Sequence, residues 1–91
     1  MDIVVVHWLD ALSDSGQVPH KQVLGMKPLP IISAGILIRN DDVGIVLTQD
    51  IMEFSDGDEE EYRHTEMIPK AYITKLQIIS IDGIDDEHPN D

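Results

Sequence analysis

The stretch that constrains the fold most is GILIRND, residues 35–41, an apolar strand that begins at a glycine and runs into an acidic turn. A glycine inside an apolar strand marks a sharp bend or a close backbone approach, and small barrels need such a point to curl closed. A second stretch, IPKAYI at residues 68–73, follows later in the chain. Together the two stretches predict a small, bent β-barrel.

Five short strands are predicted around these stretches, at residues 3–9, 31–39, 43–49, 62–68 and 73–79. The first is rich in β-branched and aromatic residues, and the second has an apolar face at Ile32, Ala34, Ile36 and Ile38. The turn at residues 40–42 makes the second and third strands a hairpin, and the uneven apolar spacing of the fifth indicates a bulge near its start. The fold class is therefore all-β, a five-stranded, strongly bent open barrel.

One short helical turn is expected at residues 19–25, because proline stands near its start and glycine at its end. Pro69 cannot donate to a ladder, so a short turn is expected there between the last two strands. At 91 residues the chain has room for one domain, which we place at residues 1–81. Residues 82–91 are interpreted as an acidic, disordered tail.

The chain has no cysteine, which excludes disulfides and cysteine-rich zinc sites as supports for a small core. Oligomerisation is the common support that remains. No apolar run approaches the roughly 20 residues that span a bilayer, and the chain starts with Asp2 rather than a basic segment. We therefore expect a cytoplasmic protein without a membrane partner.

Acidic residues dominate the charge, and the formal net charge is −12. Twelve of the 18 acidic residues lie in residues 53–66 and 82–91, so the acidity belongs to one loop and the tail. Charge runs of this kind usually form solvated segments, and a field of this sign disfavours phosphate-bearing partners.

No catalytic constellation is evident, so we expect no enzyme, no catalytic residue and no cofactor. The four histidines, His7, His20, His64 and His88, are spread along the chain without metal-site spacing, and the acidic run at 56–61 lacks EF-hand spacing. No metal site is therefore predicted. Asp41 and Asp42 form a carboxylate pair at a solvated turn, where carboxyl groups make poor general acids.

The residues of this predicted barrel resemble the Sm-like family. The first motif of that family has glycine, any residue, leucine and, four positions later, aspartate. Gly35, Leu37 and Asp41 fit that spacing. The second motif reads isoleucine, arginine, glycine, two residues and isoleucine. Here Ile68 and Ile73 fit its apolar ends, whereas proline and lysine replace arginine and glycine.

The whole chain is similar to a narrower group, small Sm-like proteins of phages and prophages. That group shows a Trp-x-Asp-Ala opening, a glycine-led apolar hairpin and an Ile-Pro-Lys closing motif, matched here by residues 8–11, 35–42 and 68–73. The resemblance implies a barrel whose subunits join fourth strand to fifth strand into a homo-oligomeric ring, a pentamer to heptamer, in the cytoplasm of an infected or lysogenic host cell. It implies no known activity.

Two alternatives to a non-catalytic ring subunit remain open: an RNA-binding Sm-like ring, and an acidic decoy that imitates nucleic acid to occupy a basic host protein. RNA-binding members hold a base with an asparagine of the first motif and an arginine of the second, and the matching positions here carry neither. Nucleic acid is therefore a disfavoured partner. Five residues are candidates for facing a neighbouring subunit or a ligand: Trp8, Asp41, Ile68, Lys70 and Tyr72.

Overall fold

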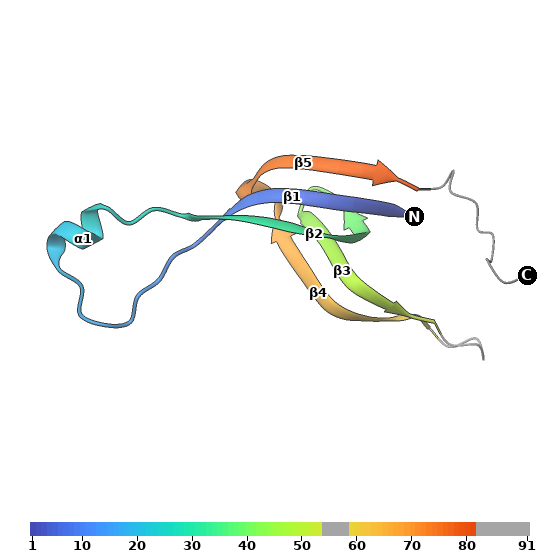
Figure 1. The fold of residues 1–91 in the computed structure, drawn as a ribbon, viewed down its shortest axis with the longest axis horizontal. Coiled ribbons are helices and arrows are strands. Elements are labelled where there is room, and N and C mark those ends of the chain that lie inside the picture. The colour runs from blue at the N-terminus through green and yellow to red at the C-terminus, as the bar shows by residue number, and fades with distance from the viewer. Residues whose placement is uncertain (54–58, 82–91) are drawn as a thin grey trace, which may run out of the picture.

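A computed structural model describes residues 1–53 and 59–81, and it is an all-β fold of five antiparallel strands in one open sheet (Figure 1). The strands are β1 (Asp2–Asp10), β2 (Leu29–Asn40), β3 (Gly44–Met52), β4 (Glu61–Pro69) and β5 (Ile73–Ser80). A helix, α1 (His20–Leu24), lies between β1 and β2, and a 3-10 turn, η1 (Lys70–Tyr72), joins β4 to β5. All five predicted strands are confirmed, as are the helical turn and the turn after Pro69.

The sheet is strongly curved because its two edges are tied together at one end. The strand order is β4-β3-β2-β1-β5, so β4 and β5 are consecutive in sequence but lie at opposite edges. Four strand spacings would separate them by about 19 Å in a flat sheet. Only η1 connects them, and the four residue steps from Pro69 to Ile73 span at most about 14 Å even when fully extended. The edges must therefore curl toward each other at this end.

The curl encloses a small core on one face of the sheet, here called the inner face. Its fully or almost fully buried apolar residues are Val4, Val6, Trp8, Ile45, Leu47 and Ile68. Ile31 and Leu37 of β2 and Ile73 and Leu76 complete it as partly buried neighbours. Burial of each such side chain contributes about 1.5–3 kcal/mol relative to exposure, so this face is the main source of the stability of the fold.

The apolar face predicted for β2 is present, but it is not the face that packs on the core. Ile31 and Leu37 pack there, whereas Ile32 is 66% exposed on the opposite, outer face. The pairing of Ile32 with His7 and of Ala34 with Val5 places these residues on the outer face together. Both faces of β2 carry large apolar residues, and the more continuous apolar face is the outer one, so periodicity alone could not identify the core side.

Gly35 and Gly44 lie where neighbouring strands approach too closely for a side chain. A Cβ on Gly35 would sit 2.8 Å from the carbonyl oxygen of Thr48 and 3.0 Å from Leu47 Cδ1. A Cβ on Gly44 would overlap the carbonyl oxygen of Ile68. The close backbone approach that the sequence predicts at Gly35 is confirmed, and Gly44 provides a second one at the β2–β3 turn.

Irregular backbone at three places sharpens the bend. The β2–β3 register shifts between Leu37 and Arg39, and the β1–β5 register shifts between His7 and Trp8, which confirms the bulge predicted near the start of β5. In β4, His64 has a positive φ of 59°. Such bulges and left-handed residues increase local twist and let a short sheet curl.

The buried hydroxyl of Thr48 holds the bend opposite His64. Its Oγ1 lies 2.9 Å from the Arg63 carbonyl oxygen, 3.1 Å from the Asp50 carbonyl oxygen and 3.1 Å from Thr65 Oγ1. The Thr48 proton can be donated to either carbonyl, and the Thr65 hydroxyl can donate to the Thr48 oxygen. The hydroxyl thus ties two strands together where their ladder is distorted.

The segment between β1 and β2 projects away from the sheet with α1 near its tip (Figure 1). We call residues 11–28 the arm. α1 has five residues and none of them is buried. The acidic tail expected at residues 82–91 and the centre of the acidic loop, residues 54–58, lie outside the described residues.

We expect Gly44→Ala and Gly35→Ala each to lower the free energy of unfolding by about 1–3 kcal/mol, because the added methyl group must displace backbone. Gly44→Ala is expected to cost more, since its new Cβ meets a carbonyl oxygen most closely. Urea denaturation followed by circular dichroism measures the change. Gly25→Ala is the matched control, because the nearest atom to its Cβ is 3.7 Å away. Wild-type stability in Gly35→Ala would contradict the close approach.

Candidate functional site

The tip of the β2–β3 hairpin carries a group of polar side chains that we call the turn cluster: Arg39, Asn40, Asp41 and Lys70. Arg39 Nε lies 3.0 Å from Asp41 Oδ2, and Lys70 Nζ donates to Asn40 Oδ1 over 2.8 Å. Lys70 comes from η1, and its backbone N–H donates to the Val43 carbonyl over 3.0 Å. All four side chains are exposed to solvent.

Asp41 organises the turn as the sequence leads one to expect of an acidic turn residue. Its Oδ1 accepts hydrogen bonds from the N–H groups of Val43, at 3.0 Å, and Gly44, at 3.2 Å, and its own N–H donates to the Gly44 carbonyl. The hydrogen bond from Gly44 is the main cause that lowers the pKa of Asp41, and the Val43 hydrogen bond and the charges of Arg39 and Lys70 add to it. Asp41 is thus an ionised turn residue rather than a proton donor.

The turn cluster contains polar groups that the sequence alone does not bring together. An amide, a guanidinium and an ammonium group converge here, although the two positions that hold a base in the RNA-binding proteins carry neither the amide nor the guanidinium in this chain. Asn40 and Arg39 directly precede Asp41, and the pairing of Gly44 with Pro69 brings Lys70 to the same place. Arg39 and Asn40, the polar pair before Asp41, are the signal that the sequence contains for this cluster. Their contact with Lys70 depends on the β3–β4 register.

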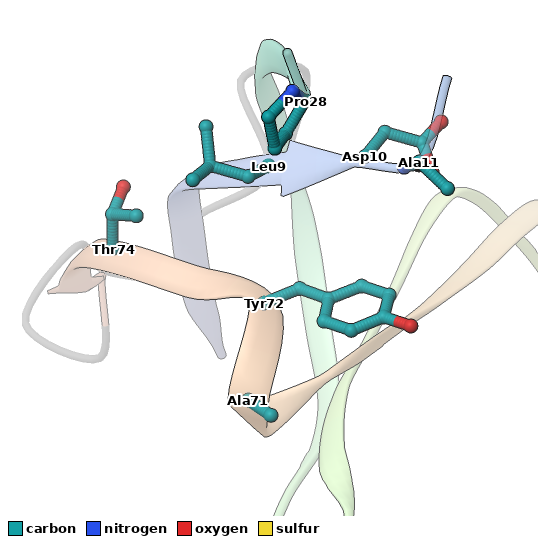
Figure 2. Close-up of a pocket in the computed structure, with 7 residues that line it drawn as sticks. All are labelled: Leu9, Asp10, Ala11, Pro28, Ala71, Tyr72 and Thr74. Atoms are coloured by element: carbon teal, nitrogen blue, oxygen red, sulfur yellow. Dashed lines mark hydrogen bonds between the residues drawn. The ribbon is translucent and has the colours of Figure 1, made fainter. Parts of the chain in front are cut away.

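A shallow pocket of about 330 Å³ lies at the base of the arm (Figure 2). Its lining residues are Leu9, Asp10, Ala11, Pro28, Ala71, Tyr72 and Thr74. In Figure 2 the Tyr72 ring lies across the hollow from Pro28, Asp10 and Ala11. The polar groups around it have local tasks, since Asp10 Oδ1 accepts the Ala11 N–H at 2.8 Å and Thr74 Oγ1 donates to the His7 carbonyl.

The five candidate residues do not form one site. Asp41 and Lys70 belong to the turn cluster, and Tyr72 belongs to the pocket. Trp8 and Ile68 are buried inside the fold, and Trp8 Nε1 donates to Ser33 Oγ over 3.0 Å. We assign both of them a packing role.

The third surface of interest consists of the two open sheet edges, β4 and β5. No other strand of the described chain pairs with the outer side of either. Large apolar side chains lie exposed along them, Tyr62 and Met67 on β4 and Ile78 and Ile79 on β5. Unpaired edges of this kind are templates for pairing with another chain. The Sm-like resemblance predicts that copies of the chain join through these two strands, but it does not identify the residues that would make contact.

Two further kinds of feature are absent from residues 1–53 and 59–81. There, no group of three or more histidine, cysteine, aspartate or glutamate side chains is arranged to hold a metal ion. Within the same residues, no helix is long and apolar enough to cross a membrane. Comparison with known protein families, with curated proteins and with solved structures finds no match for this chain.

We expect Asp41→Ala to destabilise the hairpin more than Asp41→Asn, because asparagine retains an oxygen that can accept the Val43 and Gly44 hydrogen bonds. The lowered pKa means that ionised Asp41 stabilises the fold fully above its ordinary pKa of 3.8. That contribution is lost as the pH falls through the lowered pKa of the folded state.

The measurement is the difference in urea midpoint between wild type and Asp41→Asn from pH 7 down to pH 2. The difference should be constant near neutral pH and shrink below pH 3.8. A difference that grows as the pH falls would contradict the role given to the ionised carboxylate. Asp42→Asn, on the same turn, serves as the control for a general change in net charge.

Proposed function

We propose that this chain is a non-catalytic, Sm-like subunit of the phage type that its sequence resembles, and that it assembles into a cyclic homo-oligomer. The observation that carries the proposal is the strand order β4-β3-β2-β1-β5, which leaves β4 and β5 as the open edges. These are the two strands through which the resembled family joins its subunits. A ring pairs every edge and removes the aggregation hazard of an open sheet.

The balance of buried and exposed apolar surface supports this proposal. Within the described residues the core holds six buried hydrophobic side chains, whereas large apolar residues such as Met67, Ile78 and Ile79 remain exposed along or beside the edges. Small domains that lack disulfides and metals commonly gain stability by association. Pairing of the edges would bury apolar surface that the subunit alone leaves in water.

We expect Met67→Lys and Ile78→Lys, singly and together, to shift the protein from an oligomer to a monomer, because each places an ammonium group where two edges would meet. Native mass spectrometry and light scattering at micromolar concentration report the mass. Leu24→Lys is the matched control, since this residue is 73% exposed on the arm, away from both edges.

The control should retain the wild-type mass. A wild-type protein that is monomeric under these conditions would contradict the ring, and so would an oligomer that both edge substitutions leave intact. Circular dichroism of each variant distinguishes loss of assembly from loss of folding.

A second candidate function, an RNA-binding ring, is favoured by the turn cluster. Arg39, Asn40 and Lys70 together offer a guanidinium, an amide and an ammonium group, which suit phosphates and base edges. A ring would repeat this cluster in every subunit, so weak contacts could act together. The strongly acidic composition opposes this function, which is why we rank it second.

If the ring binds RNA, Arg39→Ala with Lys70→Ala should weaken retention of oligo-U measured by fluorescence anisotropy. Removal of one phosphate contact should reduce the salt slope of log K by about 0.7. Lys27→Ala, in the arm, is the control and should bind like wild type. Absence of binding at low salt, or equal binding by the double variant, would exclude the turn cluster as an RNA site.

A further inference from the structure

The backbone of β4 shows which of its residues face the open edge. Lys70 donates its N–H to the Val43 carbonyl, and the missing Cβ of Gly44 faces the Ile68 carbonyl oxygen. Both observations identify Ile45 and Ile68 as a hydrogen-bonded pair, because such pairs alternate along an antiparallel ladder. By the same alternation Met67 and Thr65 direct their N–H and C=O groups away from β3, to the open edge.

The open-edge residues of β5 follow in the same way. The N–H of Ile81 donates to the Met1 carbonyl over 3.0 Å. Two and four residues further along the same ladder, Ile79 lies opposite Ile3 and Gln77 lies opposite Val5. Alternation makes these the hydrogen-bonded pairs. Leu76 and Ile78, which alternate with them, therefore direct their backbone groups away from β1, to the open edge.

The two edges expose residues from opposite faces of the sheet. Leu76 packs against the core and pairs with buried Val6, and Ile78 pairs with buried Val4, so the outward-directed residues of β5 lie on the inner face. Met67 alternates with buried Ile68 and pairs with Val46, so the outward-directed residues of β4 lie on the outer face. Residues that pair by hydrogen bonds in an antiparallel ladder carry their side chains on the same face. Joining β4 to β5 must therefore bring the outer face of one subunit beside the inner face of the next.

We infer that neighbouring copies of this chain pair β4 with β5 in one antiparallel register, with Met67 opposite Leu76 and Thr65 opposite Ile78. This inference rests on the proposed ring. In this register Met67 covers Leu76 directly and Ile78 diagonally, so the exposed apolar residue of each edge is buried and the partner extends the core. On the other face Glu66 lies opposite Gln77 and diagonal to Lys75, where opposite charges attract.

The neighbouring registers pair the backbone groups less well. A shift by two residues in one direction places Met67 opposite Thr74, which lies at the β1–β5 register shift and whose hydroxyl is already engaged by the His7 carbonyl. A shift by two in the other direction places Leu76 opposite Pro69, which has no N–H for the Leu76 carbonyl. Of these three registers, only the inferred one pairs both Met67 and Thr65 with Leu76 and Ile78.

The chain has no cysteine, so engineered cysteine pairs report the register without background. Non-hydrogen-bonded pairs bring side chains closest, and in the inferred register Glu66 and Gln77 form such a pair. We expect E66C/Q77C to form covalent oligomers under mild oxidation, visible as a ladder on non-reducing gels. E66C/K75C and E66C/I79C test the two shifted registers and should cross-link several-fold less. E66C alone is the control for random collisions.

The outcomes separate this inference from the proposed function. Preferential cross-linking of E66C with K75C or I79C would overturn the register and leave the ring intact. A wild-type-like oligomer in which E66C/Q77C cross-links no better than E66C alone would also overturn the register. A monomeric wild-type protein by native mass spectrometry would overturn both the register and the ring.

Discussion

The structure depends on the short link between the two edges of the sheet. Because η1 supplies only three residues between β4 and β5, the end of β4 must lie close to the start of β5, although three other strands separate them in the sheet. This tether imposes the curl that encloses the core. It also places Lys70 beside the β2–β3 turn and Tyr72 beside the arm base, two residues apart in sequence but in two different surface features. The positions of the turn cluster and of the pocket therefore both follow from η1.

The same connection places β4 and β5 at opposite edges of the sheet within one chain. η1 carries the chain from one edge of the sheet to the other instead of reversing it into a hairpin, so β4 and β5 do not pair with each other as consecutive strands usually do. Gly35 and Gly44 permit the close strand approach that the curl demands, and Thr48 holds the bend. The fold thus reaches a closed core while two backbone edges find no strand partner among the described residues.

Much of this could be predicted from the sequence, and the failures have physical causes. Strand positions were predictable because β-branched residues and turn residues alternate clearly, and Gly35 pointed to the bend. The core side of β2 was not predictable, because Ile31 and Ile32 are equally apolar and burial depends on the curl. The turn cluster was not predictable either, since the contact of Lys70 with Asn40 depends on the β3–β4 register. The left-handed backbone of His64 was not predictable either, because most histidines do not adopt this conformation and here it accompanies the bend of β4.

Charge limits which interactions could hold copies of this chain together in the proposed ring. Each copy carries a formal charge of −12, so copies repel one another, and ion pairs between exposed side chains contribute little against that repulsion. Backbone hydrogen bonds and apolar contacts do not depend on the sign of the net charge. An interface built from the N–H and C=O groups of β4 and β5, with Met67 covering Leu76 and Ile78, draws its stability from those two sources. The acidic residues oppose every association of two copies, so only an interface with enough backbone hydrogen bonds and apolar burial can outweigh them.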